Sequence, residues 1–220
     1  SLLPSVPEVI TREEDSIVVV EDSRRGWADA LNQLITLLYK GIHPTWDVSK
    51  VRPKGARLKT FGGRASGPGP LEKLFRFVVN SFYGAIGRHL TSLEVHDIVC
   101  MIGDIVVSGG VRRSALISLS DLDDREMAKA KSGAWWDDKT TVHRALSNNS
   151  AVYTHKPTLS RFMEEWTTIY DSHSGERGIC NREAMGNLTE ACGRTPCEWG
   201  TNPCCEIILR PKQFCNLSEV

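Results

Sequence analysis

Short β-branched runs alternate with segments of helical periodicity along this 220-residue chain. The run from Ser16 to Val20 has the composition of a buried strand, and the apolar residues between Arg24 and Gly41 recur at helical spacing. The same signals predict strands at 116–120 and 151–153, and helices at 71–88, 91–107, 123–132 and from Pro157 onward. Because strands and helices alternate, we expect an α/β fold.

Two of the predicted helices carry distinctive signals. Thr91 and Glu94 form the sequence signature of a capping box, which places a helix N-terminus at this point. The helix that begins near Pro157 has apolar residues at helical spacing, which we expect to face the core: Leu159, Phe162, Met163, Trp166, Ile169 and Tyr170.

Charge and cysteine content restrict the class of protein. The 27 Lys and Arg residues balance 27 Asp and Glu residues, so no net charge would attract nucleic acid or an anionic membrane. Seven cysteines, an odd number, fit a reducing compartment, and we expect a cytoplasmic protein. The apolar run from Ile98 to Val107 is interrupted by Gly103 and Asp104, so no membrane-spanning segment is predicted.

The segment from Asn202 to Glu206 combines three kinds of reactive side chain. Pro203 pushes the backbone of Asn202 toward extended angles, and in an extended segment alternate residues share a face. Asn202, Cys204 and Glu206 would then point to one side, and Cys205 to the other. Such a face offers an amide that can hold a hydroxyl group, a thiol, and a carboxylate that can accept a proton.

Several roles are open to these thiols. Cys204 can be a nucleophile, a metal ligand or a radical carrier, although no histidine lies nearby in the sequence to activate a hydrolytic thiol. The cysteines can also be incidental residues of a buried strand, since a free cysteine often behaves as a small hydrophobic residue. Zinc is a further alternative, but the gaps between Cys192, Cys197, Cys204 and Cys215 fit the paired pattern of structural zinc sites poorly, and we predict no metal site.

Asn202-Pro203-Cys204-Cys205-Glu206 resembles the finger-loop motif of ribonucleotide reductase large subunits. In that family the middle cysteine carries a thiyl radical at the tip of a loop inside a barrel. Gly175 to Asn181 is similar to the run that precedes this loop, and Phe214 to Val220 is similar to the segment that carries one cysteine of the reducing pair. The likeness extends from about Asp22 to Val220 and implies part of the ten-stranded α/β barrel of the reductases.

The short spacing from Cys204 to Cys215 is similar to that of the monomeric, adenosylcobalamin-dependent reductases more than to the di-iron type. The resemblance therefore implies adenosylcobalamin as the cofactor, bound mostly by segments outside this chain, and a ribonucleoside triphosphate as the substrate. The family motif usually has glycine where this chain has Cys205, and the resemblance assigns no role to this extra thiol.

The resemblance also implies a role for each reactive residue. Cys204 would carry the radical that takes the 3′ hydrogen of a ribonucleotide, Glu206 would take the proton of the 3′-hydroxyl, and Asn202 would hydrogen-bond the ribose. The 2′-hydroxyl would leave as water. Cys215 and a cysteine outside this chain would supply two electrons and become a disulfide, with a thioredoxin-like protein as the implied reductant.

A glycine-rich stretch precedes the helix predicted at 71–88. Glycines expose backbone N–H groups and a helix N-terminus favours anions, so phosphate binding is chemically plausible, although no Walker sequence follows. The reductase family has a segment of this kind near its effector-binding region. The candidates for nucleotide contact here are Gly62, Gly63, Arg64 and Ser66.

A second candidate loop precedes the strand predicted at 116–120. It contains two glycines followed by two arginines, and arginine can clamp a phosphate or stack on a base. The loop resembles the reductase specificity loop, which lies between the effector nucleotide and the substrate base; a turn with surface arginines is the alternative. The candidate residues are Gly110, Arg112, Arg113 and Ser114.

The polar run from Ser147 to Ser150 is similar to a run in the cobalamin-dependent reductases. Polar residues at the mouth of a barrel strand can line a substrate pocket, so Ser147 and Asn148 are predicted to contact the nucleotide. From the residues alone, a plain turn explains this run equally well.

The resemblance sets the expected organisation of the whole chain. Residues 1–220 would form a partial barrel domain, with effector and specificity loops at about 50–120 and the finger loop at about 198–216. We expect a middle fragment, or one piece of a split enzyme with a complementing reductase polypeptide, that binds a ribonucleotide substrate and a deoxynucleotide effector. The alternatives are a fragment of a di-iron-type reductase, a non-catalytic nucleotide-binding piece, and a zinc-binding structural piece.

Overall fold

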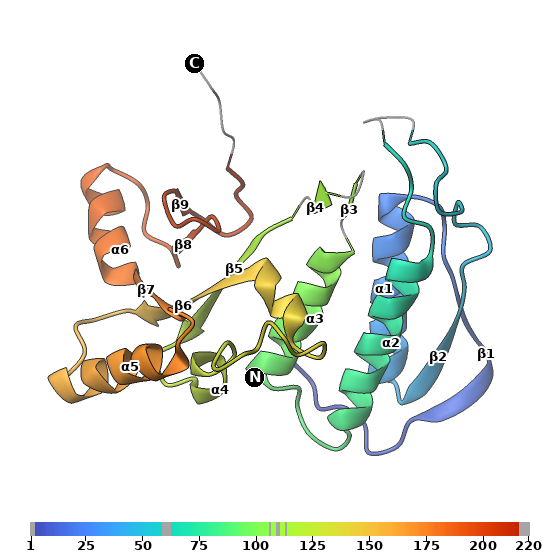
Figure 1. Cartoon of the computed structure of the whole chain (residues 1–220), viewed down its shortest axis with the longest axis horizontal. Coiled ribbons are helices and arrows are strands. Elements are labelled where there is room, and N and C mark those ends of the chain that lie inside the picture. The colour runs from blue at the N-terminus through green and yellow to red at the C-terminus, as the bar shows by residue number, and fades with distance from the viewer. Residues whose placement is uncertain (1–2, 59–62, 106, 109–110, 113, 216–220) are drawn as a thin grey trace. The chain divides into compact units, whose positions relative to one another are not determined.

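The computed structural model describes residues 3–58, 63–105, 107–108, 111–112 and 114–215. The chain divides into two compact units, an N-terminal unit of Ser1–Ser114 and a C-terminal unit of Ala115–Val220, at a boundary that the sequence did not indicate. Strands and helices alternate in both units, as Figure 1 shows, so the predicted α/β class is confirmed. None of the helices within these ranges is long and apolar enough to cross a membrane.

The N-terminal unit is a parallel strand pair covered by helices. Its elements are β1 (Thr11–Val19), α1 (Arg24–Tyr39), β2 (Ile42–Asp47), α2 (Gly69–Gly84), α3 (Ser92–Asp104), β3 (Val107–Ser108) and β4 (Val111–Arg112). The helix α1 connects β1 to its parallel partner β2, and it also packs against α2. Each helix turns an apolar stripe inward, and the resulting core includes Val18, Leu34, Leu38, Leu74, Phe75, Val78, Phe82 and Ile98.

The capping box predicted at the start of α3 is confirmed. The Thr91 hydroxyl accepts a hydrogen bond from the backbone N–H of Glu94 at 3.2 Å, and the Glu94 carboxylate accepts one from the backbone N–H of Thr91 at 2.9 Å. The guanidinium of Arg88 also donates to this carboxylate, at 2.7 Å. The Arg88 hydrogen bond, together with the Thr91 N–H, lowers the pKa of Glu94.

We expect Thr91→Ala to lower the free energy of unfolding of the N-terminal unit by about 1 kcal/mol, because the first turn of α3 loses its side-chain acceptor. Thr91→Ser keeps the hydroxyl and should retain most of the stability. Urea denaturation of the three proteins measures this difference. Equal midpoints for all three would show that the cap contributes nothing.

The C-terminal unit is built on a three-stranded parallel sheet in the order β5-β6-β7. Its elements are β5 (Leu116–Asp121), α4 (Arg125–Ala128), η1 (Val142–Leu146), β6 (Ser147–Tyr153), α5 (Leu159–Ser172), β7 (Gly178–Asn181), α6 (Arg182–Ala191), β8 (Gly200–Thr201) and β9 (Ile208–Leu209). A side chain at Gly178 would place its Cβ 2.9 Å from the Ser150 hydroxyl oxygen on the neighbouring strand. A larger residue at this position would therefore displace the Ser150 hydroxyl from its present position.

The interior of the C-terminal unit contains a charged pair. Arg177 and Glu165, 1% and 2% exposed, form two hydrogen bonds, from Nε to Oε1 at 2.7 Å and from Nη2 to Oε2 at 3.0 Å. The same guanidinium donates to the Ser120 hydroxyl at 2.9 Å and to the carbonyl oxygens of Asp121 and Leu122. This network ties α5 to the end of β5 and to the segment that enters β7.

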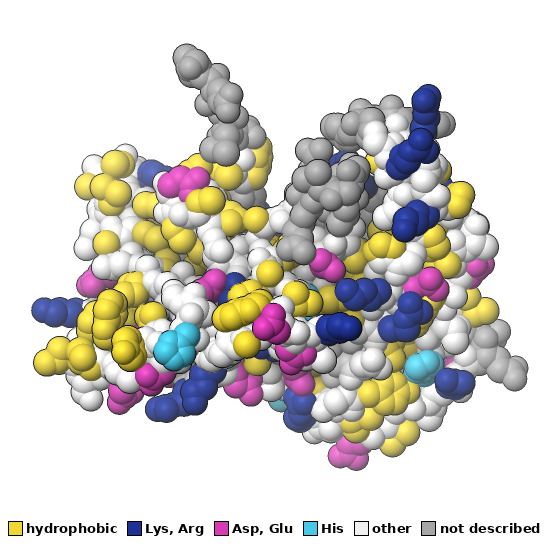
Figure 2. All heavy atoms as spheres, in the orientation of Figure 1, with side chains coloured by type: hydrophobic (Ala, Val, Ile, Leu, Met, Phe, Trp, Pro, Cys, Tyr) yellow, Lys and Arg dark blue, Asp and Glu magenta, His cyan; other side chains and the backbone are white. Residues whose placement is uncertain are grey.

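That buried pair explains an error in the sequence analysis. The predicted helix after Pro157 is present as α5, but Leu159, Met163, Trp166 and Tyr170 are exposed, and hydrophobic side chains gather on the surface over this helix in Figure 2. The inward side of the helix instead carries Glu165 and Ser172, and Glu165 forms the ion pair with Arg177 there. The prediction of a core-facing apolar stripe was therefore wrong for these four residues.

The helix predicted at 123–132 is also much shorter than expected. Only α4 forms, and the carboxylate of Asp124 caps it by accepting a hydrogen bond from the N–H of Met127 at 2.9 Å. The chain then leaves helical geometry, and the buried Lys131 binds Glu176 at 2.8 Å. A tertiary ion pair thus replaces the polar helix that local composition predicted.

Candidate functional site

The predicted reactive segment lies at the tip of a hairpin. The strand β8 pairs antiparallel with β9, and residues 202–207 connect them. The carbonyl oxygen of Asn202 accepts a hydrogen bond from the N–H of Cys205 at 3.0 Å. The side-chain oxygen of Asn202 accepts one from the N–H of Ile207 at 3.1 Å, so Asn202 closes the loop with both its backbone and its side chain.

This segment is a turn and not an extended strand, so the expected common face of Asn202, Cys204 and Glu206 was wrong. Asn202 is buried, whereas Cys204 and Glu206 are exposed. The physical reason is that asparagine and proline are favoured at the first two positions of a β-turn. The turn nevertheless presents a thiol and a carboxylate together at the tip of one loop, where both can meet a reactant.

Contacts that the sequence analysis missed anchor the base of the hairpin. Trp199 is 2% exposed, and the guanidinium carbons of Arg194 and Arg210 lie 4.4 and 5.4 Å from the centre of its ring. Arg194 also donates to the carbonyl oxygen of Ile208, in β9. Cation–π contacts of this kind hold the loop on a fixed base, and no short-range sequence signal links these residues.

The two predicted residues of β6 are engaged within the protein. The side-chain amide of Asn148 donates to the carbonyl oxygen of Pro203 at 2.7 Å, which joins β6 to the hairpin loop. Ser147 is 1% exposed, and its hydroxyl donates to the carbonyl oxygen of Asn148. The structure therefore brings Asn148 to Cys204's loop, while nucleotide contact by either residue stays a prediction.

None of the seven cysteines, which all lie within the described residues, forms a disulfide. Cys204, Cys205, Cys192 and Cys197 are exposed and Cys215 is half-buried, while residues 216–220 of the predicted reducing segment lie outside the described residues. Burial raises the pKa of the Cys180 thiol in β7. Within the described ranges, no group of three or more His, Cys, Asp or Glu side chains could hold a metal ion.

The glycine-rich stretch belongs to the N-terminal unit and folds back on the segment before it. The N–H of Ala65 donates to the carbonyl oxygen of Ala56 at 2.8 Å, and the Arg64 guanidinium donates to the carbonyl oxygen of Gly55 at 3.0 Å. Proline stands in the first turn of α2, as predicted. Gly62 lies outside the described residues, and the proposed nucleotide contacts of Gly63, Arg64 and Ser66 stay predictions.

The predicted specificity loop is flanked by paired strands. Ser108 of β3 pairs with Val111 of β4 in an antiparallel arrangement. Ser114 donates from its hydroxyl to the carbonyl oxygen of Gly103 at 2.8 Å, which ties the end of this segment to α3. Gly110 and Arg113 lie outside the described residues, and Arg112 is described by its backbone alone, so their roles stay predictions.

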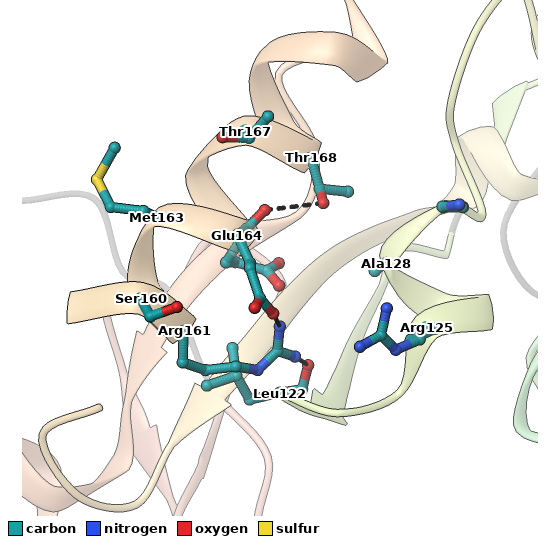
Figure 3. A pocket seen from close by; sticks show the side chains of 11 residues that line it. Leu122, Arg125, Ala128, Ser160, Arg161, Met163, Glu164, Thr167 and Thr168 are labelled. Atoms are coloured by element: carbon teal, nitrogen blue, oxygen red, sulfur yellow. Dashed lines mark hydrogen bonds and ion pairs between the residues drawn. The ribbon is translucent and has the colours of Figure 1, made fainter. Parts of the chain in front are cut away.

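Two surface cavities lie in the C-terminal unit, and no predicted site residue lines either of them. The first, of about 570 Å³, lies between α4 and α5, where Arg161 points to Glu164 and to the carbonyl oxygen of Leu122 (Figure 3). The second, of about 640 Å³, lies at the carboxyl ends of β6 and β7. Within the described residues, the tip of the hairpin is exposed at Cys204, Cys205 and Glu206.

The sequence of this chain is similar to those of known reductases. Residues 7–82 match the family model described as the insertion domain of B12-dependent ribonucleotide reductase. The chain is 35% identical, over 94% of its length, to an adenosylcobalamin-dependent ribonucleoside-triphosphate reductase from Lactobacillus acidophilus, of which it covers 29%. It is 36% identical, over 91% of its length, to the reductase of the same name from Lactobacillus helveticus, of which it covers 28%.

This chain is homologous to a segment of the adenosylcobalamin-dependent ribonucleotide reductases. A solved structure titled as a B-12 dependent (class II) ribonucleotide reductase agrees, with a TM-score of 0.67 and 25% identity over 92% of this chain and 32% of that one. The resemblance on which the sequence analysis relied is thus confirmed. The homologous segment spans less than a third of the length of these reductases.

The reductase homology gives Cys205 a physical interpretation. Its φ of 68° lies in the left-handed region, which favours glycine, the residue that the reductase motif usually has here. The Cys205 thiol accepts a hydrogen bond from the Thr201 hydroxyl at 3.6 Å. This cysteine thus adopts a backbone conformation that is suited to glycine.

Cys205→Gly is expected to stabilise the C-terminal unit by up to about 1 kcal/mol, because glycine removes the steric cost of a positive φ. Cys205→Val should destabilise it, because a β-branched residue tolerates this conformation least. Thermal unfolding of both variants measures the difference. A lower melting temperature for Cys205→Gly than for the unmodified chain would contradict the strain argument.

Proposed function

We propose that this chain reduces ribonucleoside triphosphates to deoxyribonucleotides by thiyl-radical chemistry, in a complex with the rest of a reductase barrel. The observation that supports the proposal is the exposed Cys204 at the tip of an anchored hairpin, within a chain that is 35% identical to such reductases. The three-stranded parallel sheet of the C-terminal unit would be one part of the ten-stranded barrel.

Three residues of the hairpin loop would act on the ribose. A radical on the Cys204 sulfur would take the hydrogen atom from C3′, and the exposed Glu206 carboxylate would take the proton of the 3′-hydroxyl. The side-chain oxygen of Asn202 already accepts a hydrogen bond from Ile207, so its amide nitrogen would donate to a ribose hydroxyl. In this arrangement the side-chain oxygen of Asn202 would bind the loop, and its side-chain nitrogen would bind the substrate.

The reaction balances with one pair of thiols. The 2′-hydroxyl leaves as water, and Cys215, with a cysteine from outside this chain, gives up two electrons and two protons to form a disulfide. The hydrogen atom held on Cys204 then returns to C3′. A thioredoxin-like protein would reduce the disulfide before the next turnover.

The proposed cofactor is adenosylcobalamin, which when bound supplies the homolytic chemistry that makes the radical. Cys204 fits this chemistry, because it is an exposed thiol that a bulky cofactor can approach. The corrin-binding residues would belong mostly to the part of the reductase that this chain does not span. In the N-terminal unit, the glycine-rich stretch and the loop between β3 and β4 would contact the effector nucleotide.

The test is the conversion of labelled ribonucleoside triphosphates by this chain together with the remaining reductase segments, with and without adenosylcobalamin. The proposal predicts deoxyribonucleotide only in the complete mixture with the cofactor. Product that forms equally well without adenosylcobalamin would indicate another radical source. A well-formed complex that makes no product would indicate a non-catalytic nucleotide-binding piece.

A further inference from the structure

One side chain of β6, the central strand of the sheet, contacts the hairpin loop. The residues of β6 are buried except for Asn148, which is exposed and whose amide nitrogen lies 2.7 Å from the carbonyl oxygen of Pro203. Pro203 directly precedes Cys204, so this hydrogen bond acts on the peptide unit that leads into the reactive thiol. This hydrogen bond holds the loop only as firmly as the backbone of Asn148 is itself held.

An ion pair between the buried Lys131 and the half-buried Glu176 contacts the backbone on both sides of Asn148. The Lys131 ammonium, on a side chain that is 4% exposed, donates to the carbonyl oxygen of Ser147 and to the Glu176 carboxylate, which is 2.8 Å away. The other oxygen of that carboxylate accepts a hydrogen bond from the N–H of Asn149 at 3.0 Å. One ion pair therefore holds the residue before Asn148 and the residue after it.

Lys131 and Glu176 thus restrain the strand from which Asn148 reaches the loop. Charge-assisted hydrogen bonds are stronger than neutral ones, so those of Lys131 and Glu176 restrain the start of β6. The Asn148 side chain extends from the start of β6 to the loop. At the base of the hairpin, Arg194 and Arg210 contact the Trp199 ring. The hydrogen bond from Asn148 thus attaches the tip that carries Cys204 to β6, at Pro203.

We propose that Asn148 is a positioning residue, which with the Lys131–Glu176 ion pair holds the Cys204 loop in place through the Pro203 carbonyl. The catalytic part of this inference rests on the proposed function, but the positioning part is a property of the chain itself. It also gives a role to Glu176 of the Gly175–Asn181 run, to which the sequence analysis assigned none. Asn148 acts on the loop from within the protein and does not need to touch the nucleotide.

The first test is amide hydrogen exchange in the full 220-residue chain. Asn148→Ala removes the donor, and Asn148→Asp keeps the size of the side chain but faces the Pro203 carbonyl with a carboxylate. We expect the exchange rates of the Cys205 and Ile207 amides to rise about threefold to tenfold in both variants, as loss of one ordinary hydrogen bond implies. The amides of β7 should keep their rates.

Two further variants make the comparison specific. Asn148→Gln retains an amide donor on a longer side chain and should restore part of the protection of the loop. Asn187→Ala removes an exposed asparagine of α6 and should leave the loop amides unchanged. Unchanged loop exchange in both Asn148→Ala and Asn148→Asp would overturn the proposal, and so would an equal increase in β7, because the effect would then be general loss of stability.

Turnover in the assembled reductase separates this inference from the proposed function. Asn148→Ala should lower kcat about tenfold with KM for the nucleotide unchanged, because a misplaced reactive group affects the chemical step and not binding. A raised KM with unchanged kcat would instead make Asn148 a nucleotide contact and overturn the positioning role. If the unmodified assembly makes no product, the proposed function fails, while the exchange measurement still decides whether Asn148 holds the loop.

Discussion

Replacing Cys204 with serine is expected to reduce deoxyribonucleotide formation by the assembled reductase to the background of a mixture without cofactor. The hydroxyl of serine holds its hydrogen far more strongly than a thiol does, so it cannot carry the radical. Cys204 is exposed at the tip of the hairpin, and the substitution should change the free energy of unfolding by no more than about 0.5 kcal/mol. The expected loss is therefore chemical, and a product assay beside a denaturation curve separates the two effects.

Neighbouring thiols supply the matched controls for this experiment. Cys205→Ser changes the next residue of the same loop, and Cys192→Ser changes an exposed thiol just after α6. Both variants should keep most of the activity of the unmodified chain, because neither thiol has a part in the proposed reaction. If Cys205→Ser were inactive and Cys204→Ser active, the radical would belong to Cys205, and the assignment from the motif would be wrong.

Glu165→Gln should have the largest effect on stability, because it leaves the guanidinium of Arg177 buried without its counter-charge. Removing one partner of a buried ion pair typically costs about 3–5 kcal/mol, which is a large part of the stability of a small domain. We expect the C-terminal unit to be largely unfolded, or to unfold at much lower urea concentration. Tryptophan fluorescence can follow this through Trp199, which is buried in this unit.

An exposed ion pair of the same unit provides the control. Arg182 and Glu198 are 2.9 Å apart, but the Glu198 side chain is 76% exposed, so Glu198→Gln should cost less than about 1 kcal/mol. The double variant Arg177→Met/Glu165→Met should be more stable than either single variant, because no charge is left unpaired. Equal stability of Glu165→Gln and Glu198→Gln would show that burial of the Arg177–Glu165 pair has no energetic consequence.

The features that the sequence predicted correctly depend on short-range patterns. The capping box at Thr91, the start of α2 and the strand β5 follow from residues within a few positions of each other. The reductase homology was predictable for the same reason, because its motif occupies five consecutive residues. Patterns of this kind need no knowledge of the tertiary fold.

The features that the sequence did not predict depend on partners that are distant along the chain. The orientation of α5 is set by Arg177, which lies beyond the end of that helix, and Lys131 leaves its predicted helix to reach Glu176. The hairpin turn is a different kind of error, since Asn-Pro favours a turn as readily as it favours an extended segment. The contact between Asn148 and Pro203 joins residues 55 positions apart, and no local pattern could indicate it.

The proposed role of Cys204 in this chain is to start ribonucleotide reduction. A single-turnover experiment tests it most directly, with labelled ribonucleoside triphosphate, adenosylcobalamin, the assembled reductase and no external reductant. We predict about one deoxyribonucleotide per complex, formed together with oxidation of Cys215, and none from the Cys204→Ser complex. Product formed by Cys204→Ser at the level of the unmodified chain would contradict the account.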